Sequence, residues 1–288
     1  MRKVLIISFI LCSVLAVSQS LERTVIGAGG TDLSTVNGSL DFTLGELVVQ
    51  SKVGTTQQLH QGFQQESIQL RLKLAAVVFL QGPLVTTGTV LMDDGLRKNN
   101  MLPTTSPYSD KQQCDAGVLA VTGKDAIVDW VWITLRDKSD SDTVVTGQSA
   151  LLQVDGDIVS TDGVSAVGFK ITSGDYYIAV NHRNHLAIRS QNTVALTPVA
   201  TSVNLGNSPS AVYEGAAALV SMGNGIYAMI AGDCDGNGQI QNTDATTVKQ
   251  SIGVAGYSDA DVDMNGQVQN SDVNTVLQVN MGKGEQFK

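Results

Sequence analysis

The 288-residue sequence has little of several residue types, and each shortage excludes a class of protein. Three cysteines are too few for a disulfide framework, and beyond Cys12 the pair Cys114 and Cys234 either form one long-range disulfide or stay as free thiols. Only 18 Lys and Arg face 27 Asp and Glu, so nucleic acid is a poor partner. Helix bias is also weak, whereas Gly, Val, Thr and Ser are abundant, which indicates a mainly β protein.

The first residues have the pattern of a secretory signal peptide. Arg2 and Lys3 precede an apolar run that ends at Val17, and small and polar residues follow. The run is shorter than the roughly 20 residues of a membrane-spanning helix, and no later run reaches that length. We therefore expect export to the extracellular space or cell surface, with no transmembrane segment after cleavage near residue 20.

Turn signals and apolar runs divide the chain into five parts. The predicted parts are a signal peptide at 1–20, a small N-terminal β unit at 21–66, a β-sandwich domain at 67–205, a connecting segment at 206–232 and a C-terminal module at 233–288. Within the sandwich domain no helical crossover pattern separates the short apolar runs. An antiparallel sheet arrangement is therefore expected there.

A 12-residue segment of the C-terminal module is repeated. Asp233-Cys-Asp-Gly-Asn-Gly-Gln-Ile-Gln-Asn-Thr-Asp recurs 28 residues later as Asp261-Val-Asp-Met-Asn-Gly-Gln-Val-Gln-Asn-Ser-Asp, and eight of the twelve positions are identical. Calcium takes six to eight oxygen ligands, and a loop of this length supplies them from positions 1, 3, 5, 7 and 12. The predicted ligands of two calcium ions, with position 7 acting through its main-chain carbonyl, are Asp233, Asp235, Asn237, Gln239 and Asp244 in the first loop and Asp261, Asp263, Asn265, Gln267 and Asp272 in the second.

Other loop positions favour the same interpretation. Position 6 must turn sharply in a conformation that a Cβ disfavours, and it is Gly238 in one loop and Gly266 in the other. Ile240 and Val268 at position 8 are expected to pair the loops across a short β bridge. Three carboxylates in each loop would repel one another without a cation. The alternative is two Asp- and Gly-rich surface turns that bind no metal.

One helix is predicted after each loop, and none before the first loop. The apolar face expected for these helices comprises Ala245, Val248 and Ile252 in the first and Val273, Val276 and Leu277 in the second. A duplicated loop-helix unit with Asp at position 12 resembles a type I dockerin over residues 233 to about 283. The resemblance implies a cohesin-like partner, with loop positions 10 and 11 contributing to recognition. Those positions are Asn242, Thr243, Asn270 and Ser271.

The rest of the chain carries a second resemblance. It rests on segments such as Arg23-Thr-Val-Ile-Gly-Ala-Gly-Gly, Val128-Asp-Trp-Val and Tyr176-Tyr-Ile-Ala-Val-Asn-His-Arg-Asn-His-Leu. Most of residues 22–190 is similar to exported haemagglutinin-like surface proteins of Bacteroidota. This resemblance implies adhesion at a cell surface.

No catalytic constellation is recognised in the sequence, so no enzyme is predicted. His182 and His185 are expected on opposite faces of a strand end, where they would fix a turn. Trp130 and Trp132 share a strand face, which suits either core packing or the stacking of sugar rings.

A group of aspartates in the sandwich domain leaves two interpretations open. Asp155, Asp157 and Asp162 would form either a further cation site or ordinary hairpin turns.

The sequence therefore predicts a non-catalytic, exported surface or adhesion protein that ends in a calcium-stabilised docking module. Its partner would be a cohesin-like domain or another surface protein. The alternative is a carbohydrate-binding accessory component of a polysaccharide-degrading assembly, for which a glycan would be the ligand. A hydrolase with a site assembled from distant residues is the third hypothesis.

Overall fold

The computed structural model describes residues 30–35, 38–43, 50–53, 58–61, 71–85 and 91–287. The chain divides into two compact units, residues 1–68 and 69–288. The predicted signal peptide lies outside the described residues. In the part that the structure describes, no helix is both long and apolar enough to cross a membrane.

The first unit contains two β-hairpin pairings. Strand β1 (Gly30–Thr35) pairs antiparallel with β2 (Gly38–Thr43), and β3 (Gln50–Val53) pairs antiparallel with β4 (Gln58–Gln61). Both pairings fall within the segment predicted to be a small β unit.

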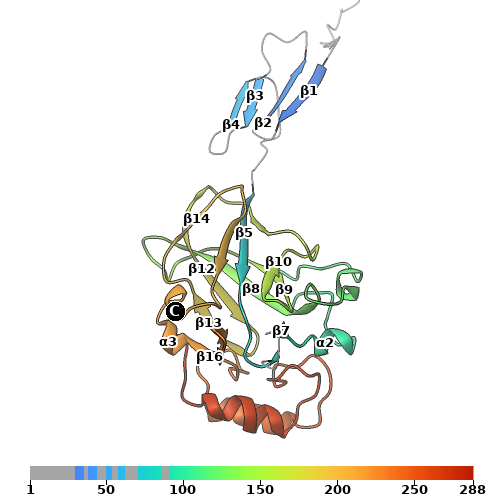
Figure 1. Ribbon diagram of the computed structural model, residues 1–288, viewed down its shortest axis with the longest axis vertical. Coiled ribbons are helices and arrows are strands. Elements are labelled where there is room, and N and C mark those ends of the chain that lie inside the picture. Colours follow the sequence, from blue (N-terminus) through green and yellow to red (C-terminus); the bar gives the residue numbers. More distant parts are fainter. Residues whose placement is uncertain are drawn as a thin grey trace, which may run out of the picture. The chain divides into compact units, whose positions relative to one another are not determined.

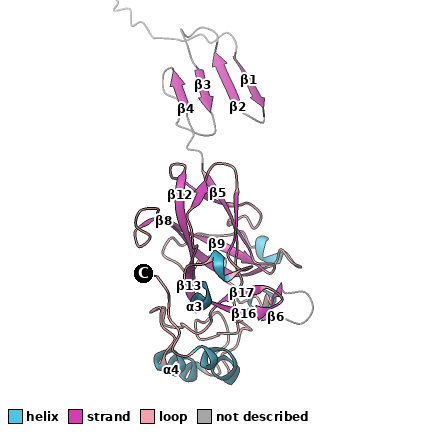
Figure 2. Cartoon of the chain, turned by 60° about the vertical axis from the view of Figure 1, so that its left-hand side comes forward, coloured by secondary structure: helices cyan, strands magenta, loops and turns pink. Residues whose placement is uncertain are grey.

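The second unit is built on one large sheet, with the strand order β11-β5-β10-β9-β8-β12-β13 (Figures 1 and 2). Its strands are β5 (Leu72–Val77), β8 (Ile127–Asp137), β9 (Val144–Gln153), β10 (Asp157–Val159), β11 (Val167–Phe169), β12 (Gly174–His182), β13 (His185–Arg189), β14 (Val194–Leu196) and β15 (Thr201–Asn204). Strand β14 also pairs with β12, and β15 pairs parallel with β5. The sheet therefore folds round one core, and the predicted mainly β, antiparallel body is confirmed with one parallel pair.

Side-chain alternation explains how the strands line this core. On β5, Leu72 and Leu74 are buried whereas Lys73 between them is exposed, as a period of two requires. Trp130 on β8 is fully buried, and its indole N–H donates to the carbonyl of Pro103 at 2.8 Å. Core packing, not sugar stacking, is thus the role of Trp130.

Several short elements of the second unit lie outside the large sheet. They are β6 (Leu84–Val85), β7 (Leu91–Met92), α2 (Gly95–Lys98), η1 (Val118–Ala120), η2 (Pro209–Ala211), α3 (Gly215–Ala218), β16 (Leu219–Gly223) and β17 (Ile226–Met229). The N–H of Met229 donates to the carbonyl of Phe79, and its own carbonyl accepts from Gln81. Residues 206–232 therefore carry a hairpin, β16–β17, whose second strand is bonded to the body.

The C-terminal segment lies at one end of the second unit, where Figures 1 and 2 both place helix α4 (Asn242–Ser251). A π-helical turn, η3 (Asp272–Leu277), and a short 3₁₀ helix, η4 (Gln278–Asn280), follow the second loop. Val248 and Leu277 are fully buried, as predicted. Ile252 is 44% exposed, contrary to expectation, because α4 ends one residue before it.

The core of the C-terminal segment is shared with the body. Ile240, Val248 and Leu277 form one buried cluster with Leu186 of β13 and with Ile230, which follows β17. Both remaining cysteines are buried and unpaired, so the free-thiol alternative holds.

Candidate metal centre

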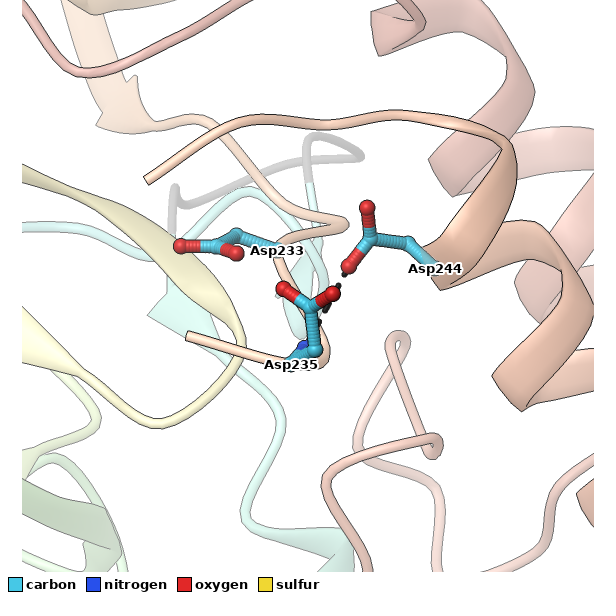
Figure 3. A group of neighbouring side chains, drawn as sticks. All are labelled: Asp233, Asp235 and Asp244. Atoms are coloured by element: carbon cyan, nitrogen blue, oxygen red, sulfur yellow. Dashed lines mark hydrogen bonds between the residues drawn. The ribbon is translucent and has the colours of Figure 1, made fainter. Parts of the chain in front are cut away.

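Two groups of three carboxylates form where the repeat predicts them. Oxygen atoms within each group all lie within 4.8 Å of one another, and the members are Asp233, Asp235 and Asp244 in the first group and Asp261, Asp263 and Asp272 in the second. Figure 3 shows the first group, in which Asp244 projects from the start of a helix toward Asp235. Within each loop, residues up to 11 positions apart thus contribute to one compact cluster.

The position-1 carboxylate is held by backbone N–H groups in the same way in both loops. Asp233 accepts from the N–H groups at positions 5 and 6, Asn237 and Gly238, each at 3.1 Å. Asp261 accepts from the same two positions of its own loop, at 3.2 and 2.8 Å. Each carboxylate oxygen has two lone pairs, so these bonds orient the group and leave lone pairs for a cation.

The position-12 carboxylate closes each loop. Asp244 Oδ1 accepts from the N–H groups of positions 2 and 3 at 2.8 and 3.3 Å, and Oδ2 accepts from position 9 at 2.8 Å. Asp272 makes the same three bonds at 2.7, 3.0 and 2.7 Å. Asp244 also lies in the first turn of α4, where Gln241 and Asp244 form a capping box. The same residue therefore helps to cap the helix and completes the loop.

The electrostatics of the clusters fit a divalent cation. Burial raises the pKa of Asp233 to about 6, and repulsion from Asp244 adds to the shift. Burial likewise raises the pKa of Asp261 to about 7, with repulsion from Asp272. A cation among the three oxygens would offset both effects, and calcium prefers such hard oxygen donors. Asn237, Asn265 and the carbonyls of Gln239 and Gln267 remain predicted ligands.

The glycines at position 6 have the conformation that the loop requires. Gly238 has φ +80° and Gly266 has φ +91°, a region that residues with a Cβ rarely adopt. Ile240 and Val268, however, do not pair with each other. Ile240 bonds to residues 282–283 and Val268 to residues 253–254, so each loop pairs with the segment that follows the other loop's helix. Both side chains are apolar because they fill the shared core.

Two other sequence expectations concern the body. His182 and His185 do not point to opposite faces, because they lie on different strands and are partners across the β12–β13 hairpin, with Nδ1 to Nδ1 at 3.0 Å. Gly82 N–H donates to His185 Nε2 at 3.2 Å, and burial lowers the pKa of both imidazoles. The two histidines thus pack as a pair inside the hairpin.

The aspartates of the sandwich domain form turns. Asp155 accepts from the N–H of Asp157, and Asp162 accepts from those of Val164 and Ser165. Among the described residues the two loops hold the only groups of three candidate metal ligands. The hairpin interpretation of these aspartates is therefore the one that the contacts favour.

Sequence reasoning missed the residues that join the second loop to the body. Asn184 donates from Nδ2 to the carbonyl of Asp261 at 2.8 Å, and Arg183 donates to the carbonyl of Ser258. Met264, at position 4, is 1% exposed and lies in the core of the body. The available signal was the one substitution in the repeat that changes chemical character, Gly236 to Met264.

Comparisons with known proteins leave the family open. No protein-family model matches the sequence, and no curated protein matches it. Two solved structures from Acetivibrio cellulolyticus, a C-terminal and an N-terminal interface mutant of a type II cohesin–X-dockerin complex, are similar at 14% and 12% identity. Their TM-scores are 0.38 and 0.39, and each match covers 74% of this chain and 97% of the other. Likeness at this level identifies no family.

Proposed function

We propose that this is a non-catalytic, exported surface or adhesion-type protein whose C-terminal dockerin-like module binds two calcium ions and docks onto a partner protein. The observation that supports it most is the repetition of one carboxylate geometry in two loops. The bonds to positions 1 and 12 recur with the same donors, although nothing but the sequence repeat requires them to. In a surface turn without a bound cation, three neighbouring carboxylates would repel one another and destabilise the turn.

The proposed docking surface is polar. Asn242 and Thr243 at positions 10 and 11 of the first loop are exposed, as is Asn270 in the second. These side chains offer hydrogen bonds without charge. The proposed partner is a cohesin-like domain or another surface protein, and calcium supports its binding by fixing the helices that carry these residues.

The carbohydrate-binding alternative has less support. Trp130 is fully buried and Trp132 is half-buried, with its ring centroid 5.9 Å from that of Tyr108. A sugar would need an exposed aromatic face.

Calcium titration of the full chain by isothermal calorimetry tests the metal sites. We expect two ions per chain, with dissociation constants of roughly 10⁻⁴–10⁻³ M or tighter. Asp244→Ala and Asp272→Ala should each leave one ion. Asp142→Asn, which removes an exposed carboxylate of the body, should leave two. A chain that binds no calcium would end the proposal.

Docking is tested separately, by capture of envelope proteins of the source organism on the immobilised chain. A partner that binds in calcium, is released by chelator and is not captured by the Asp244→Ala/Asp272→Ala double variant supports docking. Identical capture by the double variant would show that the loops have no part in it.

A further inference from the structure

The two proposed calcium loops have the same ligand residues at the same positions, but they differ in how closely they pack against the β body. At position 4 the first loop has Gly236, which is exposed, and a Cβ built there would meet no atom within 4 Å. The second loop has Met264, which is 1% exposed and belongs to the hydrophobic core of the β body. Met264 also has φ +59°, a conformation that a bulky residue adopts only when its surroundings impose it.

The body accommodates the second loop by close backbone approach. A Cβ on Gly82 would lie 2.0 Å from the carbonyl oxygen of Val262, and one on Gly95 would lie 3.1 Å from that of Met264. Glycine at both positions therefore lets the loop rest directly on the body. A Cβ on Gly266 of the loop would likewise lie 2.6 Å from Met101 Sδ.

The turn of the β12–β13 hairpin bonds to the same loop. Asn184 is fully buried, and its Nδ2 donates to the carbonyls of Asp261 and Asp259 at 2.8 and 3.1 Å. Asp261 is also the predicted position-1 calcium ligand. One residue thus contacts the body through its carbonyl and the metal site through its carboxylate.

A buried ion pair secures this turn. Arg183 Nε donates to Asp129 Oδ2 at 2.9 Å, and Tyr257 donates its hydroxyl to Asp129 Oδ1 at 2.7 Å. The guanidinium also lies 4.4 Å from the centroid of the Tyr257 ring. Tyr257 belongs to the segment between α4 and the second loop. The buried carboxylate of Asp129 on β8 therefore accepts hydrogen bonds both from the body, through Arg183, and from the C-terminal segment, through Tyr257.

We propose that the second calcium site is a structural site of the β body, whereas the first stabilises chiefly its own loop. This inference rests on the proposed calcium function. Calcium in the second loop holds Asp261 and the backbone that carries Met264. Loss of this calcium therefore frees the Met264 side chain to leave the core of the body and weakens the hydrogen bonds that Asn184 donates to the loop. Position 8 of both loops, Ile240 and Val268, lies in the smaller cluster with Leu186, so the difference between the loops is at position 4. There the first loop has the exposed Gly236, and loss of its calcium releases no side chain from the main core of the body.

The chain contains a reporter for this difference. Its two tryptophans, Trp130 and Trp132, both lie on β8, so intrinsic tryptophan fluorescence follows unfolding of the body. At calcium about a hundredfold above the dissociation constant, the midpoint of the wild-type thermal transition should rise by about 5–10 °C over that in chelator.

Matched variants separate the two loops. Asp233→Ala, in the first loop, should keep most of the calcium-induced shift, and Asp261→Ala, at the same position of the second, should lose it. Met264→Gly gives the second loop the residue that the first loop carries. This variant should still bind two ions by calorimetry, while its calcium-induced shift falls to less than half of the wild-type value.

Three results would overturn the inference. They are an unchanged wild-type midpoint in the presence of bound calcium, an equal loss of the shift in Asp233→Ala and Asp261→Ala, and a full shift in Met264→Gly. Each of them is compatible with calorimetric binding of two ions, so they leave the proposed function standing. The absence of any binding would end the proposed function instead. The wild-type and Met264→Gly measurements remain decisive if Asp261→Ala fails to fold.

Discussion

The carboxyl groups of Asp233 and Asp261 should make calcium binding by the two proposed loops depend on pH. Their raised pKa values, about 6 and about 7, mean that protons compete with calcium near neutrality. Between pH 8 and pH 6 the ionised fraction of a group of pKa 7 falls about tenfold, and that of a group of pKa 6 about twofold. We therefore expect calcium affinity to fall by about these factors in the second and first loop, as calorimetry at the two pH values would measure.

The same shifts fix the sign of the stability effect without calcium. A folded-state pKa above the value of 3.8 for an ordinary aspartate means that the folded protein holds more protons than the unfolded chain between about pH 4 and pH 7. In chelator the free energy of unfolding should therefore decrease as pH rises through that range. An affinity that is the same at pH 8 and pH 6, with circular dichroism showing an intact fold at both, would contradict the pH prediction.

At single positions, sequence spacing predicted correctly the contacts that form within one short segment. The carboxylates of Asp233 and Asp244 belong to one 12-residue loop, so their convergence follows from the loop alone. The pairing of His182 with His185 does not, because the two residues lie on different strands, β12 and β13, and are partners across the hairpin, so alternation along one strand does not apply to them. The turn between them, Arg183-Asn184, contains no glycine, so it lacks the usual sequence signal of a two-residue hairpin turn.

The loop-helix element depends on its position-6 glycine. Replacing Gly266 or Gly238 by Ala places a Cβ at φ +91° or +80°, which costs roughly 1–2 kcal/mol. Each substitution should weaken calcium binding at its own loop by about 5–30-fold. Calorimetric titration of both variants measures this loss.

Gly123 supplies the control for that experiment. It has φ +87° in the body, and a Cβ there would meet no atom within 4 Å. Gly123→Ala should therefore carry similar backbone strain while calcium affinity stays at the wild-type value. If Gly266→Ala and Gly238→Ala bound calcium as tightly as Gly123→Ala, the loops would not depend on the left-handed turn.

Element-level expectations held where periodicity is strong. The first predicted helix forms as α4, and its buried Val248 was predicted by helical spacing. The second helix departs from regular geometry at η3, a π-helical turn. The bridge partners of Ile240 and Val268 also differ from expectation. Sequence spacing does not determine which segment returns to each loop, because that choice depends on how the two helices cross.

At the scale of the whole molecule, the least predictable feature is the union of the C-terminal segment with the body. The repeat marks residues 233–288 as a module, but Asn184 bonds to Asp261, 77 residues further along the chain, and Met264 lies against the still more distant Gly95. Contacts between such distant residues are hard to predict from a single sequence, because no local pattern specifies them. The one sequence feature that indicates these contacts is position 4 of the loops, which is Gly236 in the first and Met264 in the second.

Removing residues 233–288 tests this union directly. Leu186 and Ile230, now at most 1% exposed, would lose the apolar side chains that cover them, and the body would lose Met264. Each uncovered side chain costs about 1.5–3 kcal/mol when exposure is complete. The tryptophan-monitored midpoint should therefore fall by at least about 5 °C.

Removal of residues 21–66 is the matched deletion. It takes away only residues of the first compact unit, and none of them is among the described members of either buried cluster. The midpoint and the calcium-induced shift should both stay at the wild-type values. A body that melts at the wild-type temperature without residues 233–288 would instead show that the C-terminal segment merely rests on a self-sufficient domain, because a core that needs Met264 and the cover over Leu186 cannot lose both at no cost.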